Sequence, residues 1–468
     1  MSEQDERGNG AQAPSDGKMA TIPSLRPGPR ERVVVRQRWA AAFGATAAAV
    51  ALIVVVAALF ATHARPTAPQ TAHGSATQTA GGGADTQDQI QRFTMLSPTD
   101  GWAIGANQLP DASVPQADFY QYDGKQWTFK QKLAGFSFLG VESPSIQMLS
   151  PTNGWALDSL GHLARFDGTT WRMAPIIVPG SPQITSFLAL DMVAPTQGWA
   201  AAMAGSNPAT SQLAFLRYDG QQWIVDQSAI AEPDLQAFSP DFGGISVTPQ
   251  GDVWAVGTEE TTLSPSAMVL VVYHRENGVW RVASRIGPAS KSLQRIPHGI
   301  LMTSTTTGWI VGEIDHVTVT PSSVSVDSTE PLLLRYDGTT WTPVHVPLTN
   351  TSAADTLTQI EASGPQNIWI TGTTGASTLS PSGVWIHALL LQYDGAHWTQ
   401  TPLGGSIGDG SIGGAGVTSA DVTTIAVAPN GDLWAGGFVV STQVTGTRSL
   451  FWRYSHGAWS TTPLHNGK

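Results

Sequence analysis

The chain has 468 residues, no cysteine, 13% charged residues and a formal net charge of −11 at pH 7. The absence of cysteine excludes disulfides and thiolate metal sites, and the eleven histidines show no metal-ligand spacing, so no metal and no cofactor is expected. Residues 1–38 carry seven basic against five acidic residues, which leaves seventeen against thirty for the rest. This acidic remainder argues against nucleic acid and anionic membrane surfaces as its partners.

The N-terminal segment predicts a disordered tail followed by a membrane anchor. Residues 39–62, from Trp39 to Thr62, contain no charged residue, and about 24 residues of helix span a hydrocarbon core of about 30 Å. Four arginines precede this segment, whereas Arg65 is the only lysine or arginine between it and Arg92. The positive-inside rule therefore predicts a single-pass cell-membrane protein with residues 1–38 in the cytoplasm and the remainder extracytoplasmic.

Two other structures are compatible with this segment. A cleaved signal peptide is one, because residues 61–64 (ATHA) form a passable cleavage site, but the apolar stretch is long and nearly thirty polar residues precede its basic region. A buried core helix is the other, and the rest of the chain shows no helical pattern that would bury it. Residues 63–87, rich in Gly, Thr, Ala and Gln, are expected to form a flexible linker.

Residues 88–468 repeat one pattern seven times, at a period of about 55 residues that is typical of propellers. A small turn leads to a first tryptophan, and a stretch of about 16 to 32 residues then leads to a Gly-x-x-Trp or Gly-x-Trp hairpin. These fourteen tryptophans are predicted to be structural and to pack between blades. The first members are Trp102, Trp155, Trp199, Trp254, Trp309, Trp369 and Trp434, and the second are Trp127, Trp171, Trp223, Trp280, Trp341, Trp398 and Trp459.

The second repeat, the shortest, predicts four short antiparallel strands. Residues 145–149 alternate polar and apolar, residues 150–154 form a Pro- and Asn-Gly-containing turn, and Asp167-Gly168 opens a hairpin. The hairpin aspartate is missing in repeats four and seven but the glycine is kept in all seven, which indicates a backbone requirement. One such sheet cannot bury both faces alone, so the sequence predicts an all-β, seven-bladed propeller of four-stranded antiparallel blades, preceded by a single transmembrane helix.

The order of strands also predicts how the ring is organised. Because the first strand opens the repeat region, the ring is expected to close by packing blade seven on blade one without a shared strand. The turns between strands one and two and between strands three and four are expected on one face. The longer, variable connections are expected on the opposite face, which is called the loop-rich face below.

These signatures resemble the Asp-box, or bacterial neuraminidase repeat (BNR), propellers. They are most similar to the photosystem II assembly-factor type, through Gly101-Trp102-Ala103-Ile104-Gly105 and Asp167-Gly168-Thr169-Thr170-Trp171. Residues 247–257 (VTPQGDVWAVG) are also similar to the propeller ectodomains of bacterial two-component sensors. The resemblance covers about 80% of the chain and implies a propeller, but such repeats serve many functions. The Asp-box match is degenerate, since this chain has one residue fewer between Asp and Trp.

Sialidase activity, which some relatives carry, needs an arginine cluster for the substrate carboxylate. The candidates all occupy the same third-strand position and are therefore expected to be solvated or stacked on a neighbouring tryptophan. They are Arg165, Arg217, Arg335 and Arg453. No Gly-x-Ser-x-Gly or His-Glu-x-x-His motif is present, and the glycine-rich run at 404–410 lacks the Lys-Ser/Thr of a phosphate loop.

Variable loops on a rigid scaffold are the usual place for binding residues. Trp385, the one tryptophan expected in a loop, is the best single candidate for a ligand contact. Aromatic and acidic residues of the loop-rich face complete the predicted binding set, which is Trp385, Phe238, Phe242, Glu259 and Asp409, and no catalytic residue is assigned.

The leading hypothesis is a non-enzymatic, membrane-anchored propeller that binds a protein, peptide or glycan through its loop-rich face. The alternative is an extracellular carbohydrate-active hydrolase or lyase, with two carboxylates facing each other within about 5–10 Å at the mouth of the central tunnel. A third option, assembly of a membrane complex, follows the photosystem-factor resemblance. It predicts a basic patch, against which the acidic balance argues.

Overall fold

The computed structural model describes residues 89–106, 116–137, 144–175, 184–205, 212–228, 241–260, 268–287, 292–320, 324–349, 351–379, 385–403, 417–441 and 447–465. The predicted tail, membrane anchor and linker lie outside these residues. Among the residues it does describe, no helix is long and apolar enough to cross a membrane.

The described residues form 28 β-strands, which fall into seven groups of four consecutive strands. The first three groups are blade 1, with β1 (Gln89–Ser97), β2 (Asp100–Ala106), β3 (Ala117–Tyr122) and β4 (Trp127–Leu133); blade 2, with β5 (Ser145–Ser150), β6 (Asn153–Leu157), β7 (Leu163–Phe166) and β8 (Trp171–Met173); and blade 3, with β9 (Ile184–Ala194), β10 (Gln197–Ala204), β11 (Gln212–Tyr218) and β12 (Trp223–Val225).

The strands of the remaining four groups are longer on average. They are blade 4, with β13 (Phe242–Val247), β14 (Val253–Glu260), β15 (Met268–Glu276) and β16 (Val279–Ile286); blade 5, with β17 (Leu293–Ser304), β18 (Thr307–Val319), β19 (Val324–Tyr336) and β20 (Trp341–Pro343); blade 6, with β21 (Thr356–Gly364), β22 (Asn367–Leu379), β23 (Trp385–Tyr393) and β24 (Trp398–Gln400); and blade 7, with β25 (Val417–Val427), β26 (Leu433–Ser441), β27 (Thr447–Ser455) and β28 (Ala458–His465).

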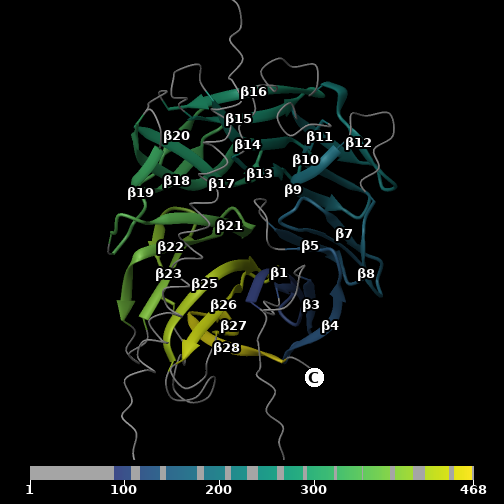
Figure 1. The fold of residues 1–468 in the computed structure, drawn as a ribbon, viewed down its shortest axis with the longest axis vertical. Helices are drawn as coiled ribbons and strands as arrows, with labels where there is room; N and C mark the ends of the chain where they lie inside the picture. Colours follow the sequence, from purple (N-terminus) through teal and green to yellow (C-terminus); the bar gives the residue numbers. More distant parts are fainter. Residues whose placement is uncertain are drawn as a thin grey trace, which may run out of the picture. The chain divides into compact units, whose positions relative to one another are not determined.

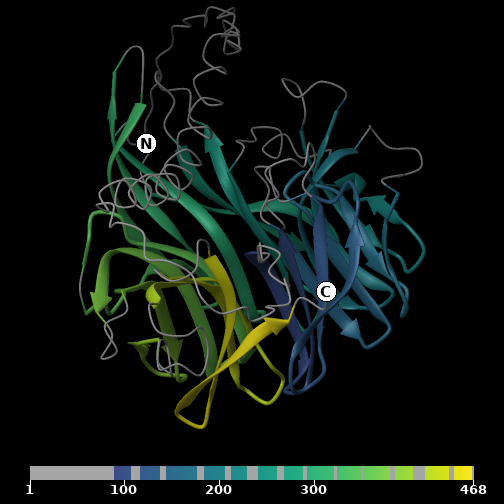
Figure 2. The ribbon, with the colours of Figure 1, turned by 60° about the horizontal axis from the view of Figure 1, so that its bottom comes forward.

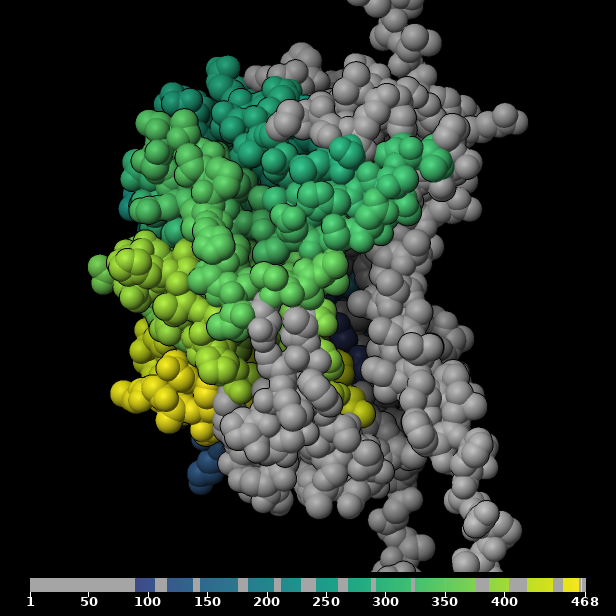
Figure 3. Space-filling view, turned by 90° about the vertical axis from the view of Figure 1, so that its left-hand side faces the viewer, coloured from purple at the N-terminus to yellow at the C-terminus, as the bar shows by residue number. Residues whose placement is uncertain are grey.

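Each blade is an antiparallel sheet of sequential strands, and the blades form a ring (Figure 1). The first strands contact one another in the order β1, β5, β9, β13, β17, β21, β25 and back to β1, which places them around a common axis. Side chains of successive blades pack along the side that carries blades 5 to 7 (Figure 3). The predicted seven-bladed, all-β propeller of four-stranded antiparallel blades is therefore confirmed.

The ring closes without an exchanged strand, as the order of strands predicts. Blade 7 packs on blade 1 through β25 and β1, where Thr423 Oγ1 donates to the carbonyl oxygen of Ile90 at 3.0 Å. The sequence did not predict a second connection at the periphery. There the end of β28 pairs in parallel with the start of β4, with Leu464 opposite Trp127.

The repeated tryptophans form edge contacts between neighbouring blades. At six of the seven blade interfaces the first tryptophan of a blade meets the second tryptophan of the next blade, as in Trp155 and Trp223, whose ring centroids lie 5.7 Å apart at 74°. The same pairing joins blade 7 to blade 1 through Trp434 and Trp127. Between blades 6 and 7, Trp369 meets Tyr454. Thirteen of the fourteen are buried and Trp459 is partly buried. Edge-to-face pairs of this kind contribute about 1 kcal/mol each beyond area burial, so they stabilise every interface at which they occur.

In four blades, packing explains why the residue before the first tryptophan is a glycine. Each of these glycines pairs across the strands with a methionine, and an added Cβ would overlap the methionine sulfur; the pairs are Met95–Gly101, Met148–Gly154, Met192–Gly198 and Met302–Gly308. In the other three blades both members differ together, as Val247–Val253, Ala362–Ile368 and Val427–Leu433. The side chains at these two paired positions therefore fill one space together, so that a larger residue at one requires a smaller residue at the other, as close packing demands.

The hairpins between third and fourth strands come in two forms. In five blades an aspartate accepts two backbone N–H bonds, as Asp123 does from Lys125 and Gln126 at 2.9 Å. In blades 4 and 7 the turn contains only two residues, Asn277-Gly278 and His456-Gly457, and both have positive φ. This is the type I′ geometry, which needs no aspartate but still needs glycine. The structure thus explains why the aspartate is lost and the glycine kept.

The two faces of the ring are arranged as predicted. In blades 1, 2, 3 and 5 the hairpin glycine lies against a threonine of the turn between strands one and two, as Gly168 does against Thr152, so both turns share one face. On the opposite face the hairpins between second and third strands differ in length. They extend furthest in blade 5, where β18 and β19 have 13 residues each, against five and four for β6 and β7 (Figure 2).

Candidate functional site

In the first strand of each blade, the residue at one particular position determines how that blade is bonded to the next blade near the axis. It is the residue paired with the first tryptophan of the same blade, eight residues before it in sequence. In chain order this position holds Thr94, Gln147, Asp191, Ser246, Leu301, Glu361 and Ala426.

Three of these residues bond the backbone of the next blade, and we call them the interblade latches. Gln147 Oε1 accepts the N–H of Met192 at 2.8 Å, Asp191 Oδ2 accepts that of Val247 at 2.7 Å, and Ser246 Oγ accepts that of Met302 at 2.9 Å. Gln147 also donates to Asp191 Oδ1 at 3.1 Å. The latches therefore join blades 2 to 5 and leave their own acceptors occupied.

Glu361 has the latch position of blade 6 but is not used as a latch. Gln359, two residues earlier, takes that role instead, because its side chain accepts from the N–H of Ile425 at 3.1 Å and donates to the carbonyl oxygen of Ile425 at 2.9 Å. Gln359 Nε2 also donates to Glu361 Oε1 at 3.0 Å. Glu361 Oε2 accepts no hydrogen bond from the residues that the structure describes.

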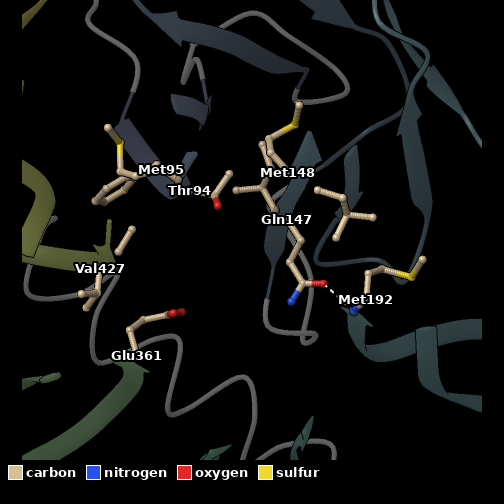
Figure 4. Close-up of a pocket in the computed structure, with 11 residues that line it drawn as sticks. Thr94, Met95, Gln147, Met148, Met192, Glu361 and Val427 are labelled. Atoms are coloured by element: carbon tan, nitrogen blue, oxygen red, sulfur yellow. Dashed lines mark hydrogen bonds between the residues drawn. The ribbon is translucent and has the colours of Figure 1, made fainter. Parts of the chain in front are cut away.

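Glu361 points into a pocket near the axis, which we call the axial pocket (Figure 4). It has a volume of about 220 Å³ and draws on blades 1, 2, 3, 6 and 7. In Figure 4 the Glu361 carboxylate faces the wall that carries Thr94 and Gln147. The lining residues are Phe93, Thr94, Met95, Ile146, Gln147, Met148, Leu149, Met192, Glu361, Ala426 and Val427, most of which belong to the second half of a first strand.

The axial pocket carries an excess of negative charge. The pKa of Glu361 is raised to about 7, mainly by burial and to a smaller extent by the charge of Asp191, while the hydrogen bond from Gln359 and the charge of Arg92 act in the opposite direction. Burial also raises the pKa of Asp191. Arg92 is the one cation coupled to Glu361 among the described residues; burial lowers its pKa to about 10, and its Nη1 donates to the carbonyl oxygen of Gln91. No ion pair is formed between Arg92 and Glu361 in the described structure.

A second glutamate of similar pKa lies outside the axial pocket. Burial, with a contribution from Asp315, raises the pKa of Glu313 on β18 to about 7. Its Oε1 lies 3.7 Å from Nε2 of His298, whose Nδ1 donates to the carbonyl oxygen of Leu357 at 2.9 Å. Glu313 therefore serves as a control for Glu361, because its pKa is raised in the same way but it lies outside the axial pocket.

The predicted binding residues do not gather at this pocket. Trp385 is not in a loop; it begins β23, where its backbone pairs with Leu379 and Ser419, because the strand extends further toward the loop-rich face than the turn signals indicate. Phe242 begins β13 and packs, partly buried, on the core of blades 3 and 4. Glu259 is buried in an ion pair with Arg285, with an Oε2–Nε distance of 2.8 Å. Phe238 and Asp409 lie outside the described residues.

The third-strand arginines do not converge. Arg165, Arg335 and Arg453 each stack on the first tryptophan of their own blade at 5.3–5.6 Å from the ring centroid. Arg217 is exposed, and its tryptophan, Trp199, is covered by Arg275 of the next blade at 4.7 Å. No group of three or more potential metal ligands was found within the described residues.

Glu361 and Arg92 are not among the binding residues predicted from the sequence. A signal was present, because the residues eight positions before each first tryptophan can be aligned without a structure, and Glu361 then stands beside Gln147, Asp191 and Ser246. The alignment shows a row of polar residues near the axis. It does not show which of them is engaged by the backbone.

No protein-family model matches the chain, and no curated protein sequence matches it. Solved structures with a similar fold include YCF48 bound to D1 peptide, at 15% identity and a TM-score of 0.42, covering 79% of this chain and 94% of that one. The β-propeller domain of the Trilobed protease from Pyrococcus furiosus is 9% identical, with a TM-score of 0.45 and coverage of 82% and 97%. A puromycin-hydrolyzing peptidase of Mycobacterium tuberculosis is 10% identical, with a TM-score of 0.49; 82% of this chain matches about half (55%) of it. These likenesses concern the propeller fold.

Proposed function

We propose that this chain is a binding module, anchored in the cell membrane by residues 39–62, whose extracytoplasmic propeller holds a ligand in the axial pocket. One observation carries the proposal: Glu361 occupies a latch position, yet Gln359 makes the bonds to blade 7 in its place. Glu361 is a partly buried carboxylate with a raised pKa that bonds Gln359 but not the backbone of the next blade, and groups with perturbed pKa values concentrate at functional sites. A ligand that pairs with Glu361 would account for its place in the pocket.

Binding is favoured over hydrolysis by the composition of the pocket. A glycoside hydrolase uses two carboxyl groups that flank the scissile bond. Glu361 is the only carboxylate among the lining residues, and Asp191 is occupied by the Val247 N–H and by Gln147. The carbohydrate-active alternative therefore lacks its second group in the described residues. A glycan remains a candidate ligand beside a peptide or a protein.

The loop-rich face is the predicted surface for the remainder of a larger ligand. Trp385 begins β23 and Glu259 lies at the end of β14, both on that side of the ring, and blade 5 stands between their two blades. A ligand that contacts both regions would bind with more area than the axial pocket offers by itself.

The test is an array of peptides and glycans probed with the full chain in detergent micelles. Wild type, Glu361→Gln, Trp385→Ala and Glu313→Gln are compared, the last as a control that removes a similarly shifted carboxyl outside the axial pocket. We expect Glu361→Gln to lose at least tenfold in affinity and Glu313→Gln to bind as wild type. Unchanged binding by Glu361→Gln would refute the axial pocket as the binding site.

The membrane topology is tested separately. Because the chain has no cysteine, a single one can be introduced as a reporter, Ser15→Cys in the tail or Ser460→Cys on the exposed edge of β28. In intact cells a membrane-impermeant maleimide should label Ser460→Cys, and Ser15→Cys only after permeabilisation. The reverse labelling would contradict the proposed orientation.

A further inference from the structure

We propose that the axial pocket binds a primary alkylammonium group, such as a small amine or the side chain of a lysine, and that binding releases the proton of Glu361. This inference rests on the proposed function and names the chemistry of its ligand.

The charge of the pocket favours a cation. Glu361 from β21 and Asp191 from β9 both contribute negative charge, and Arg92 from β1 is the single opposing group coupled to Glu361. The walls from β5 and β25 add no charge, since they contribute Gln147, Ala426 and Val427 among their lining residues. A bound cation would supply the partner that Glu361 lacks.

The arrangement of acceptors favours an ammonium over a guanidinium. Glu361 Oε1 already accepts from Gln359, so the carboxylate has one oxygen available and cannot form the bidentate pair that suits arginine. An ammonium is a compact charge with three donors. Thr94, on the wall opposite Glu361 in Figure 4, supplies a further acceptor oxygen, whereas Gln147 Oε1 is already engaged by the N–H of Met192.

The rest of the lining suits an alkyl stem. Among the apolar lining residues, Leu149 and Val427 are partly exposed, whereas Phe93, Ile146 and the three methionines are buried in the interblade cores. The volume of about 220 Å³ exceeds that of a four-carbon chain with its ammonium group, leaving room for water. A hydrated metal ion fits less well, because the lining offers one carboxylate only.

Proton release follows from the state of Glu361. Its carboxyl is about half protonated at pH 7, and an ammonium binds the ionised form, so binding should release about half a proton at this pH. The ionised fraction rises from about one tenth at pH 6 to about nine tenths at pH 8. The affinity should therefore be about tenfold higher at pH 8 than at pH 6.

The experiment is isothermal titration calorimetry of the full chain in detergent micelles, in phosphate and in MOPS, whose different ionisation enthalpies report proton release. The probes are n-butylammonium, the lysine analogue Nα-acetyl-lysine-N-methylamide, and n-butanol as an uncharged control. We expect both ammonium probes to bind wild type with the stated pH dependence, and the tighter one identifies the source of the ammonium. Glu361→Gln should lose binding and Glu313→Gln should retain it.

Three results would overturn the inference: n-butanol binding as tightly as n-butylammonium, equal affinity for both ammonium probes in wild type and Glu361→Gln, or no affinity change between pH 6 and pH 8. The pH series on wild type decides the question even if a variant does not fold. If neither ammonium probe binds but Glu361→Gln abolishes an interaction found on the array, the pocket stands as a binding site and only its ammonium specificity fails.

Discussion

Replacing Glu361 with glutamine should make the protein more stable at pH 8 and should change its stability near pH 5 by less than about 1 kcal/mol. The unfolded chain binds the Glu361 proton with an ordinary pKa near 4.5, whereas the folded chain binds it with a pKa of about 7. A carboxyl whose pKa is raised on folding leaves stability intact below the unfolded pKa. It then reduces stability as pH rises toward the folded pKa, because the unfolded state loses its proton first.

The magnitude follows from the size of the shift. Each pKa unit corresponds to about 1.4 kcal/mol, so a shift from 4.5 to about 7 corresponds to at most about 3 kcal/mol above pH 7. Glutamine has no proton to lose and can still accept the hydrogen bond from Gln359. The variant should therefore gain up to about 3 kcal/mol over wild type at pH 8, less where water in the pocket screens the charge.

The assay is guanidinium denaturation followed by tryptophan fluorescence at pH 5 and pH 8, which reports on the interblade tryptophans. Glu276→Gln, an exposed glutamate on β15, removes the same charge without the burial and is the control. If Glu361→Gln changed stability equally at both pH values, or destabilised the protein at pH 8, Glu361 would not be a partly buried carboxylate without an ion-pair partner.

Three further predictions concern the contacts between strands and blades. Gly198→Val should destabilise by about 1–3 kcal/mol through overlap with Met192, and adding Met192→Val, which reproduces the pair found in blade 4, should recover most of the loss in a double-mutant cycle. Asp191→Ala should cost about 1–3 kcal/mol because it leaves the Val247 N–H without its acceptor; Asp191→Asn should cost less, and any difference in the opposite order would refute the latch. Arg275→Ala removes the stack on Trp199 and the 2.7 Å ion pair with Asp226, so thermal denaturation should show a loss of about 1–2 kcal/mol, while the exposed Arg217→Ala should stay within about 0.5 kcal/mol.

The fold could be predicted because its determinants are local and repeated. The hairpin between the third and fourth strands requires glycine in every blade, because its φ is 80–99°. The tryptophans pack into the cores between neighbouring blades. Such requirements recur in all seven repeats and therefore stand out in one sequence. Trp385 shows the limit of this reasoning, since the flanking Ser-Pro-Ser-Gly residues indicate a turn, yet the strand begins at Trp385 itself.

The candidate site could not be predicted, because it arises from an exchange of roles between two residues of one strand. Gln359 and Glu361 are both polar, both face the next blade, and either could bond its backbone. The structure decides between them, with Gln359 reaching Ile425 and Glu361 left at the pocket. A single sequence shows the row of polar residues around the axis but carries no information on which member is free.

The state of Glu361 can be measured directly by carbon-13 NMR of its carboxyl group, with glutamate side chains labelled and the resonance assigned by its loss in Glu361→Gln. The account predicts a midpoint near pH 7 that falls when n-butylammonium is added. A midpoint near 4.5 that n-butylammonium does not move would contradict it, because Glu361 would then be an ordinary solvated carboxylate.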